Sequence, residues 1–407
     1  LDGPQPKPHP GQPLLGFGYR PSLWSEPPHK RFLDEAAGNT PVILVAADLH
    51  SAWLNSAALA AYGFPPDVDG VVRETDCFNL LRRLENVPAE VLDGWVVDAL
   101  QAASARGVTG IVDMEMAWNP GTWRRRLDEG MRLPVRVQAG FYAQDLDRAV
   151  ASGMHSGDRL LPPGDPQCAL LTLGPLKIIA DGSLNTRTAF CFAPYRAEGA
   201  EGRGVLNVSP DALTELLGRA RTAGLRAAVH AIGDEANSVV LDAFATAGAA
   251  GSIEHVQLLR GSDIARMAAL GVDASIQPQH AVDDRDVCDQ FWADRISDAY
   301  RMRSLLDAGV RLRFGSDAPV AALDPWVAIG AAVARTDSAR TPWHLEEALT
   351  VTEAIAASTA SGLAWPQVGD SADLVVLESD PRMVEATQLA GMRVAATLCA
   401  GNVSFLA

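Results

Sequence analysis

The segment LKIIADGS, residues 176–183, begins with the short apolar run LKIIA, which carries one charged side chain, Lys177. Three later segments share this pattern, because in each an apolar run ends near a side chain that binds metal ions or transfers protons. They are AAVHAIGD (227–234) with His230, SIEHVQLL (252–259) with His255 and RLRFGSDAP (311–319) with Asp317. A buried parallel strand is apolar on both faces, and its last residues face the mouth of a β/α barrel. The four segments therefore predict a barrel whose mouth gathers these side chains.

The chain between residues 107 and 317 alternates between apolar runs and helical patterns. Several helical segments end in glycine, such as DALTELLGRARTAG (211–224), which precedes the run LRAAVHA. A helix closed by glycine and followed by a Val/Ile/Leu run is typical of a β/α unit. Seven strands are expected, at 108–114, 134–142, 175–181, 225–231, 252–256, 272–278 and 311–317. The predicted fold class is α/β, a (β/α)8 TIM-type barrel of which seven strands are recognisable.

The composition disfavours several classes of partner. The chain has 407 residues, 48% of them hydrophobic, so it can bury a barrel core and a smaller domain. Its formal net charge of -16 disfavours nucleic acid and anionic membrane surfaces, which bind basic patches. The five cysteines are scattered without a C-x-x-C pair, which predicts reduced, mostly buried thiols and a cytoplasmic location. The expected partners are a small-molecule substrate and a second copy of the chain in a homodimer.

Short motifs throughout the chain carry a family resemblance. They are LGFGYRPSLW, DLHSAWLNSAAL, GVTGIVDM, KIIADGSLNTRTA, VHAIGD, IEHVQLL, SIQPQH, FGSDAPV and ADLVVLESDP. Through these motifs the chain resembles the amidohydrolase superfamily, in the branch similar to the N-substituted formamide deformylases. The resemblance implies a barrel with an accessory small β-sandwich. It also implies a metal-dependent hydrolase that acts on carbon–nitrogen bonds other than peptide bonds.

The resemblance also divides the chain into parts. It implies an irregular segment at 1–13, a barrel at 14–365 with an inserted subdomain at about 14–100, and part of a β-sandwich at 366–407. Within the insertion, PVILVAADLH (41–50) predicts a buried strand, and residues 51–59 predict a helix. The family carries an H-x-H pair on its first barrel strand, and this sequence contains none. The chain is therefore expected to start after that strand or to have lost it, and to expose an apolar sheet face near its C-terminus.

The strand-end side chains suit a hydrolytic metal site. Catalytic zinc takes histidine nitrogens and carboxylate oxygens, and it lowers the pKa of a water molecule from about 15.7 to about 7. His230 and His255 end neighbouring strands and are candidate ligands of one ion. Asp317 is a candidate ligand and a candidate general acid/base, because its carboxylate could take a proton from water and pass it to the leaving amine. The predicted cofactor is a divalent metal, with zinc expected, as one or two ions.

The resemblance assigns further roles to single residues. In the family, the lysine at the position of Lys177 is carboxylated and its carbamate bridges two metals, so Lys177 is a candidate metal ligand. From the residues alone, a buried salt bridge to Asp181 is the alternative. Three residues are candidates for substrate binding. They are His280 and Gln277, at the end of the strand predicted for 272–278, and Arg187. A polar rim for the first two and ordering of a loop for Arg187 are their alternatives.

The sequence thus predicts cleavage of an amide-like C–N bond in a small molecule by a metal-activated water, with Asp317 as general acid/base. Two alternatives stay open at this point. One is a mononuclear metal deaminase of the same superfamily, which would tolerate the loss of a carbamate at Lys177. The other is a non-catalytic barrel that has lost its first metal half-site together with H-x-H.

Overall fold

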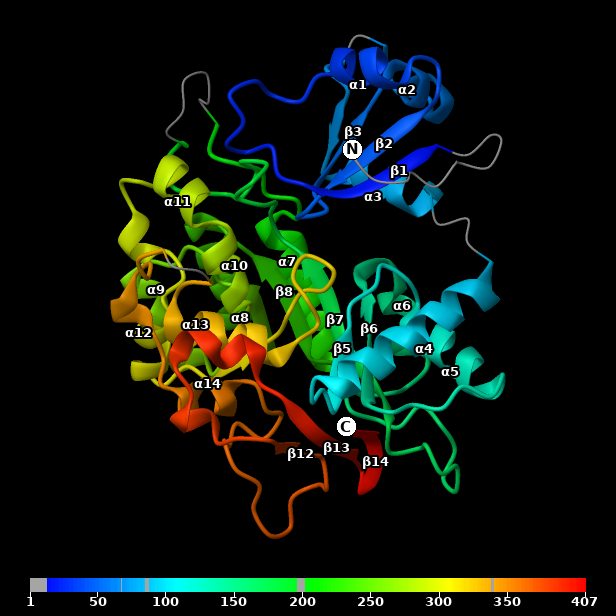
Figure 1. Ribbon diagram of the computed structural model, residues 1–407, viewed down its shortest axis with the longest axis vertical. Helices are drawn as coiled ribbons and strands as arrows, with labels where there is room; N and C mark the ends of the chain where they lie inside the picture. The colour runs from blue at the N-terminus through cyan, green and yellow to red at the C-terminus, as the bar shows by residue number, and fades with distance from the viewer. Residues whose placement is uncertain (1–12, 67, 85–87, 196–201, 338–339) are drawn as a thin grey trace. The chain divides into compact units, whose positions relative to one another are not determined.

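The computed structural model describes residues 13–66, 68–84, 88–195, 202–337 and 340–407, which divide into two compact units (Figure 1). The smaller unit contains the described residues before Pro88 together with Gly182–Thr188. The larger unit contains Pro88–Asp181 and Ala189–Ala407. Each unit has a hydrophobic core of its own. Apart from its last residue, the irregular segment expected at 1–13 lies outside the described residues.

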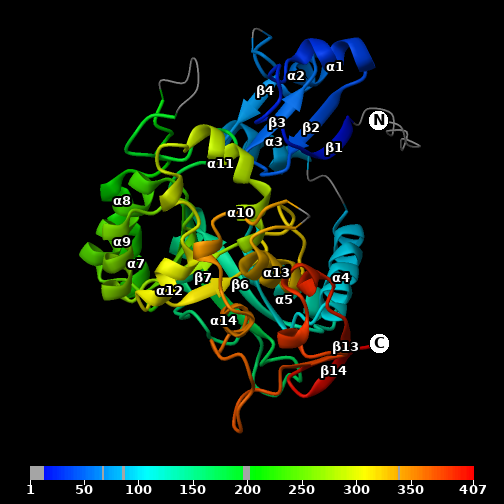
Figure 2. The ribbon, with the colours of Figure 1, turned by 60° about the vertical axis from the view of Figure 1, so that its left-hand side comes forward.

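Seven parallel strands form one sheet in the larger unit, side by side in the order of the sequence (Figures 1 and 2). They are β5 (Gly110–Asp113), β6 (Arg136–Tyr142), β7 (Leu171–Ile179), β8 (Ala227–Ala231), β9 (Gly251–His255), β10 (Asp273–Ile276) and β11 (Leu312–Phe314). Each coincides with a predicted strand, so the α/β class and the seven strands are confirmed. Strands β5 and β11 are the two edges, and the sheet does not close into a barrel within the described residues.

Helices precede, connect and follow the strands of this sheet. They are α4 (Ala89–Ala105), α5 (Asn119–Asp128), α6 (Leu146–Ala151), α7 (Pro210–Thr222), α8 (Asp234–Ala247), α9 (Gly261–Leu270), α10 (Pro278–Asp283), α11 (Arg285–Phe291), α12 (Met302–Asp307), α13 (Pro325–Ala334) and α14 (Val351–Ala357). Short 3-10 turns lie at Ala143–Asp145, Ile296–Asp298, Leu345–Glu347, Pro381–Met383 and Ala386–Gly391. The expected glycine stop is clear at α9, where Gly271 has φ +64°, a left-handed conformation that favours glycine. No helix among the described residues is both long and apolar enough to cross a bilayer.

The inner strand β8 is buried on both faces, as expected for a parallel sheet of apolar strands, whereas the edge strand β5 is partly exposed, with Val112 48% exposed. All five residues of β8, AAVHA, are buried, so His230 is held by packing on every side. On β7 the buried residues include Leu176 and Ile178, which flank Lys177. The expectation of mostly buried thiols is also confirmed, since four of the five cysteines are buried.

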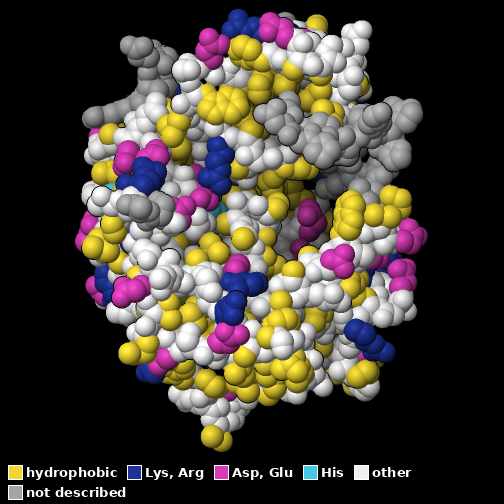
Figure 3. Space-filling model, in the orientation of Figure 1, with side chains coloured by type: hydrophobic (Ala, Val, Ile, Leu, Met, Phe, Trp, Pro, Cys, Tyr) yellow, Lys and Arg dark blue, Asp and Glu magenta, His cyan; other side chains and the backbone are white. Residues whose placement is uncertain are grey.

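The C-terminal strands form a separate antiparallel sheet of β12 (Leu374–Leu377), β13 (Val394–Cys399) and β14 (Asn402–Leu406). Residues 366–407, expected to form part of a β-sandwich, contribute this single antiparallel sheet, and their membership in a sandwich stays a prediction. Helix α4 packs against this sheet, and the buried Thr397 hydroxyl donates a 2.7 Å hydrogen bond to the carbonyl of Ser104 at the end of that helix. Hydrophobic side chains gather on its surface (Figure 3), where Val403 and Leu406 are 63% and 74% exposed. The expected exposed apolar face is thus observed.

The smaller unit is built on a four-stranded sheet of β1 (Leu14–Tyr19), β2 (Val42–Ala46), β3 (Ser51–Leu54) and β4 (Val71–Arg73). Its helices are α1 (Lys30–Ala37), α2 (Ser56–Tyr62) and α3 (Thr75–Leu84). The helix predicted for 51–59 is wrong in its first half, because Ser51–Leu54 pair with β2 and β4. Asn55 then starts α2, since its buried Oδ1 accepts the N–H groups of Ala58 and Val42. A four-residue strand that runs directly into a helix has too few residues to show its own period.

Candidate metal centre

Three side chains converge beyond the carboxyl ends of the neighbouring strands β9, β10 and β11. His255 ends β9, His280 lies in α10 after β10, and Asp317 follows β11. One ligand atom of each lies within 4.8 Å of those of the other two. His280 Nε2 is 3.9 Å from Asp317 Oδ2, and the ring centroids of His255 and His280 are 6.0 Å apart. Ligands of one tetrahedral zinc ion lie about 2.1 Å from it and hence about 3.4 Å from each other. Small side-chain movements would therefore bring the three groups onto one ion.

The donor set fits a divalent metal. Two imidazoles and one carboxylate are ligands that catalytic zinc commonly takes. His280 Nε2 is buried and, within the described residues, has no hydrogen-bond partner. Such groups are rare in folded proteins because an unpaired buried polar atom costs free energy. His280 Nε2 also lies 3.9 Å from a carboxylate oxygen of Asp317. A ring nitrogen without a hydrogen bond, close to a carboxylate, is expected of a metal site in its metal-free form.

His230 extends the cluster on the other side of His255. Its ring centroid lies 4.6 Å from that of His255, with the ring planes at 68°. The sequence placed these two histidines together as ligands of one ion, and the structure brings them together. It also brings in His280, which the sequence assigned to substrate binding. The reason is that β10 ends at Ile276 and α10 begins at Pro278, so His280 follows the strand within one helical turn.

Two residues of the cluster have left-handed backbones. The φ angles are +76° at His255 and +55° at Asp317, and Val256 follows at +47°. Residues with side chains seldom adopt this region, and such strain concentrates at functional sites. At His255 it has a geometric consequence. His255 is in register with Ala231, the residue after His230, so regular strand pairing would direct the two histidines to opposite faces. The positive φ turns the His255 side chain about its N–Cα bond, and the two rings meet.

Lys177 is buried on β7 with 8% of its surface exposed. Its register partners are Tyr142 on β6 and Ala228 on β8. The salt bridge to Asp181 that the sequence left open is not observed. Among the described residues, the Lys177 side chain takes part in no hydrogen bond or ion pair, and the Asp181 carboxylate contacts other groups. Lysine is rarely buried unless it is paired, so packing and ion pairing alone do not explain Lys177.

Gln277 and Arg187, the two other expected substrate residues, occupy different units. Gln277 lies directly before α10 in the larger unit, 5% exposed, and its Oε1 has no partner among the described residues. Arg187 is exposed and belongs to the smaller unit, within Gly182–Thr188. Substrate binding stays a prediction for both residues.

The loop that carries Arg187 is ordered within the smaller unit by Glu74. Glu74 Oε1 accepts hydrogen bonds from the hydroxyls of Thr186 (3.1 Å) and Thr188 (2.5 Å), and Oε2 lies 2.9 Å from His50 Nδ1. Burial acts to raise the pKa of Glu74, but the hydrogen bonds from His50, Thr188 and Thr186 outweigh it, and the pKa lies below its ordinary value. These contacts order the loop through Glu74, and loop ordering by Arg187 itself stays a prediction.

The turn after His230 requires glycine, which gives a first prediction. A Cβ added at Gly233 would lie 2.1 Å from the carbonyl oxygen of Phe190. We expect Gly233→Ala to lower the free energy of unfolding by more than about 3 kcal/mol, because the backbone must shift. Gly218→Ala is the matched control, since Gly218 lies in α7 with nothing near the new Cβ. Alanine there should stabilise the helix by up to about 1 kcal/mol. Urea unfolding measures both, and equal effects would contradict the packing argument.

A parallel β/α sheet with histidines and an aspartate clustered at its carboxyl edge is an arrangement typical of metal-binding β/α proteins. Residues 5–405 match the Amidohydrolase family, and the chain belongs to this family. The resemblance that the motifs carry is thereby confirmed. Membership also agrees with a TIM-type barrel, to which the described residues contribute seven parallel strands.

Individual relatives agree with this assignment. The chain is 29% identical over 420 residues to Long After Far-Red 3 of Arabidopsis thaliana, covering 91% of this chain and 70% of the relative. It is 28% identical over 446 residues to N-substituted formamide deformylase of Arthrobacter pascens, covering 97% of this chain and 79% of the relative. A solved structure, an uncharacterized metal-dependent hydrolase from Pyrococcus horikoshii OT3, superposes with a TM-score of 0.68 at 27% identity. That match covers 86% of this chain and 72% of the other.

Proposed function

We propose that this protein is a metal-dependent hydrolase that cleaves the C–N bond of a small amide-like molecule. The observation that carries the proposal is the convergence of His255, His280 and Asp317, with His280 Nε2 buried and without a hydrogen-bond partner among the described residues. Membership in the Amidohydrolase family supports the reaction class. The formamide deformylase among the relatives supports an amide-like substrate.

Residues of the larger unit could supply all the metal ligands of such a site. His255, His280 and Asp317 would hold a divalent ion, with His230 and Lys177 as further ligands of a second ion. The donor set suits zinc, and a bound ion would supply an acidified water and polarise a substrate carbonyl. Lys177, buried without a partner, suits this role as a carbamate better than as an ammonium.

Asp317 is the candidate for proton transfer. Its side chain is 41% exposed, whereas that of His280 is 7% exposed, so the carboxylate is the more accessible of these two groups. It can accept a proton from the attacking water and return it to the nitrogen of the leaving amine, which departs as a neutral molecule. Gln277, with its buried carbonyl oxygen, is placed next to the cluster by the start of α10 and could orient a substrate N–H group.

A mononuclear deaminase is the second candidate. One observation favours it, namely that a single group of three ligand residues, His255, His280 and Asp317, is found among the described residues. The two candidates differ in the number of ions bound and in their need for Lys177.

Metal content tests the proposal directly. Elemental mass spectrometry of the purified full chain should find one or two divalent ions per molecule. They should be removed by a chelator and restored by added zinc. His280→Ala should lower the stoichiometry because it removes one of three convergent ligands, whereas His155→Ala, at a side chain 63% exposed, should leave it unchanged. A wild-type protein that binds no ion after incubation with zinc would refute the hydrolase assignment.

A further inference from the structure

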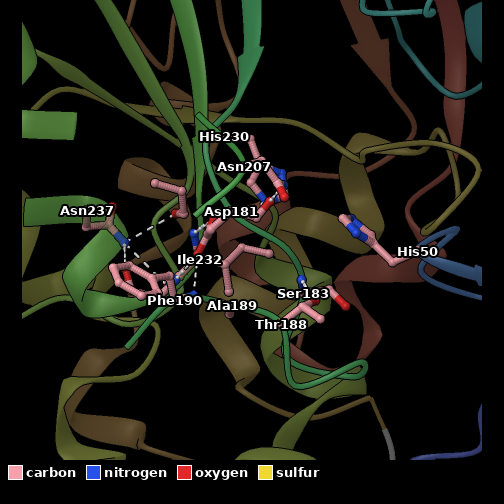
Figure 4. Close-up of polar contacts among 12 residues, drawn as sticks. His50, Asp181, Ser183, Thr188, Ala189, Phe190, Asn207, His230, Ile232 and Asn237 are labelled. Atoms are coloured by element: carbon pink, nitrogen blue, oxygen red, sulfur yellow. Dashed lines mark hydrogen bonds and ion pairs between the residues drawn. The ribbon is translucent and has the colours of Figure 1, made fainter. Parts of the chain in front are cut away.

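We propose that Asp181 is a positioning residue of the metal centre, which fixes the ring orientation and the protonated nitrogen of His230. The inference rests on the proposed function. Asp181 follows the end of β7 and is fully buried, with 0% of its surface exposed. Its Oδ1 lies 3.4 Å from His230 Nε2, and Figure 4 shows the two side chains facing each other. The sequence offered Asp181 only as a salt-bridge partner for Lys177.

Three backbone N–H groups hold the carboxylate of Asp181 in place. Oδ1 accepts the N–H of Ile232 at 3.0 Å, and Oδ2 accepts those of Gly233 and Phe190, both at 2.9 Å (Figure 4). A fully buried carboxylate is stable only with several such donors. These bonds leave Oδ1 free to accept one further hydrogen bond, from the direction of His230. The carboxylate is therefore a rigid acceptor at a fixed distance from the imidazole ring.

Asn237 fixes two of the peptide groups that donate to Asp181, because it donates hydrogen bonds to their carbonyl oxygens. This fully buried side chain on α8 donates through Nδ2 to the carbonyl oxygens of Ala231 at 3.3 Å and Ile232 at 3.4 Å, which belong to the peptide groups whose N–H groups bond Asp181. The Nδ2 group of Asn207 donates to the backbone carbonyl of Asp181 at 2.9 Å. The position of the carboxylate is thus set by the frame around it, independently of His230. Because the Asp181 carboxylate is fixed in this way, it can orient the imidazole ring of His230.

The consequence for His230 follows from imidazole chemistry. A neutral imidazole carries its proton on one nitrogen, and the nitrogen without the proton is the one that can bind a metal. The carboxylate of Asp181 faces Nε2, so it favours the tautomer protonated there. Nδ1 is then the coordinating atom. Carboxylate partners of this kind fix the tautomer of metal-binding histidines and typically change metal affinity 10- to 100-fold.

Zinc affinity of the full chain tests the inference, measured by competition with a chromophoric chelator. Asp181→Asn should weaken zinc binding about 10- to 100-fold, because its amide offers Nε2 a poorer acceptor. Asp263→Asn is the matched control, since Asp263 is also fully buried but is bonded to Arg260 and Arg266. It should lose stability without losing zinc affinity. Equal zinc affinity in Asp181→Asn and the wild type would overturn the positioning role.

A second measurement decides the matter if Asp181→Asn fails to fold. Nitrogen-15 spectra of the histidine rings in the wild-type, metal-free protein at pH 8 report each tautomer. The His230 signal is assigned among the eight histidines by its loss in His230→Ala. We expect the tautomer protonated at Nε2, and the opposite tautomer would overturn the inference. The two proposals fail separately, because a protein that binds no zinc refutes the hydrolase assignment while the ring tautomer still tests Asp181.

Discussion

Asp317→Asn should lower turnover at least about 10³-fold while the metal content of the purified protein stays at the wild-type level. Asparagine keeps an oxygen that can bind an ion, and like aspartate it tolerates the left-handed backbone, which has φ +55° at this position. It cannot accept a proton from water. The variant therefore removes proton transfer and leaves the ligand set nearly intact. Release of amine from a panel of N-substituted formamides measures the rate, and elemental mass spectrometry measures the metal.

Asp317→Ala is the companion variant, because it removes the ligand oxygen together with the base. It should lose metal as well as turnover, which separates the two roles of one side chain. Full activity in Asp317→Asn would show that another group moves the proton. Loss of metal in Asp317→Asn would show that the charge of the carboxylate, and not only its oxygen, is needed to hold the ion.

The strands of the larger unit were predictable because burial on both faces leaves a strong signal. AAVHA at β8 and the apolar run of β7 have few polar positions, and the helices between strands end in recognisable glycines such as Gly271. These signals are local in the sequence. The same reasoning selected His230, His255 and Asp317 as candidates, because each lies at or near the end of an apolar run.

The arrangement within the site was less predictable because it depends on backbone angles and on distant contacts. The positive φ of His255 turns its ring toward His230, and no residue type announces that conformation. The role of Asp181 depends on N–H groups from residues 190, 232 and 233, which only the fold brings near. For His280 a local signal did exist. Pro278 favours the first turn of a helix, so QPQH marks a helix start and not a strand end.

Lys177→Met should abolish turnover and remove one ion from a two-ion site, while the metal-free protein becomes no less stable. Methionine fills a similar volume without a charge. In the wild type Lys177 is 8% exposed and has no ion-pair partner among the described residues, so replacing its ammonium with a thioether removes an unfavourable burial. Replacement of buried charges by apolar groups is often neutral or stabilising, by about 1 to 4 kcal/mol in measured cases. Thermal unfolding of the metal-free protein and its metal stoichiometry give the two readouts.

The combination of these readouts separates the interpretations of Lys177. A carbamate ligand predicts a stable apoprotein that has lost metal and activity, and it also predicts that zinc uptake by the wild-type apoprotein depends on added bicarbonate. If Lys177 has only a structural role, the metal-free Lys177→Met protein should be less stable than the wild type. A second substitution that restores its stability should then restore its activity. A mononuclear site predicts that activity and one bound ion survive in Lys177→Met, because His255, His280 and Asp317 are all retained. Only the first outcome would support the carbamate assignment of Lys177.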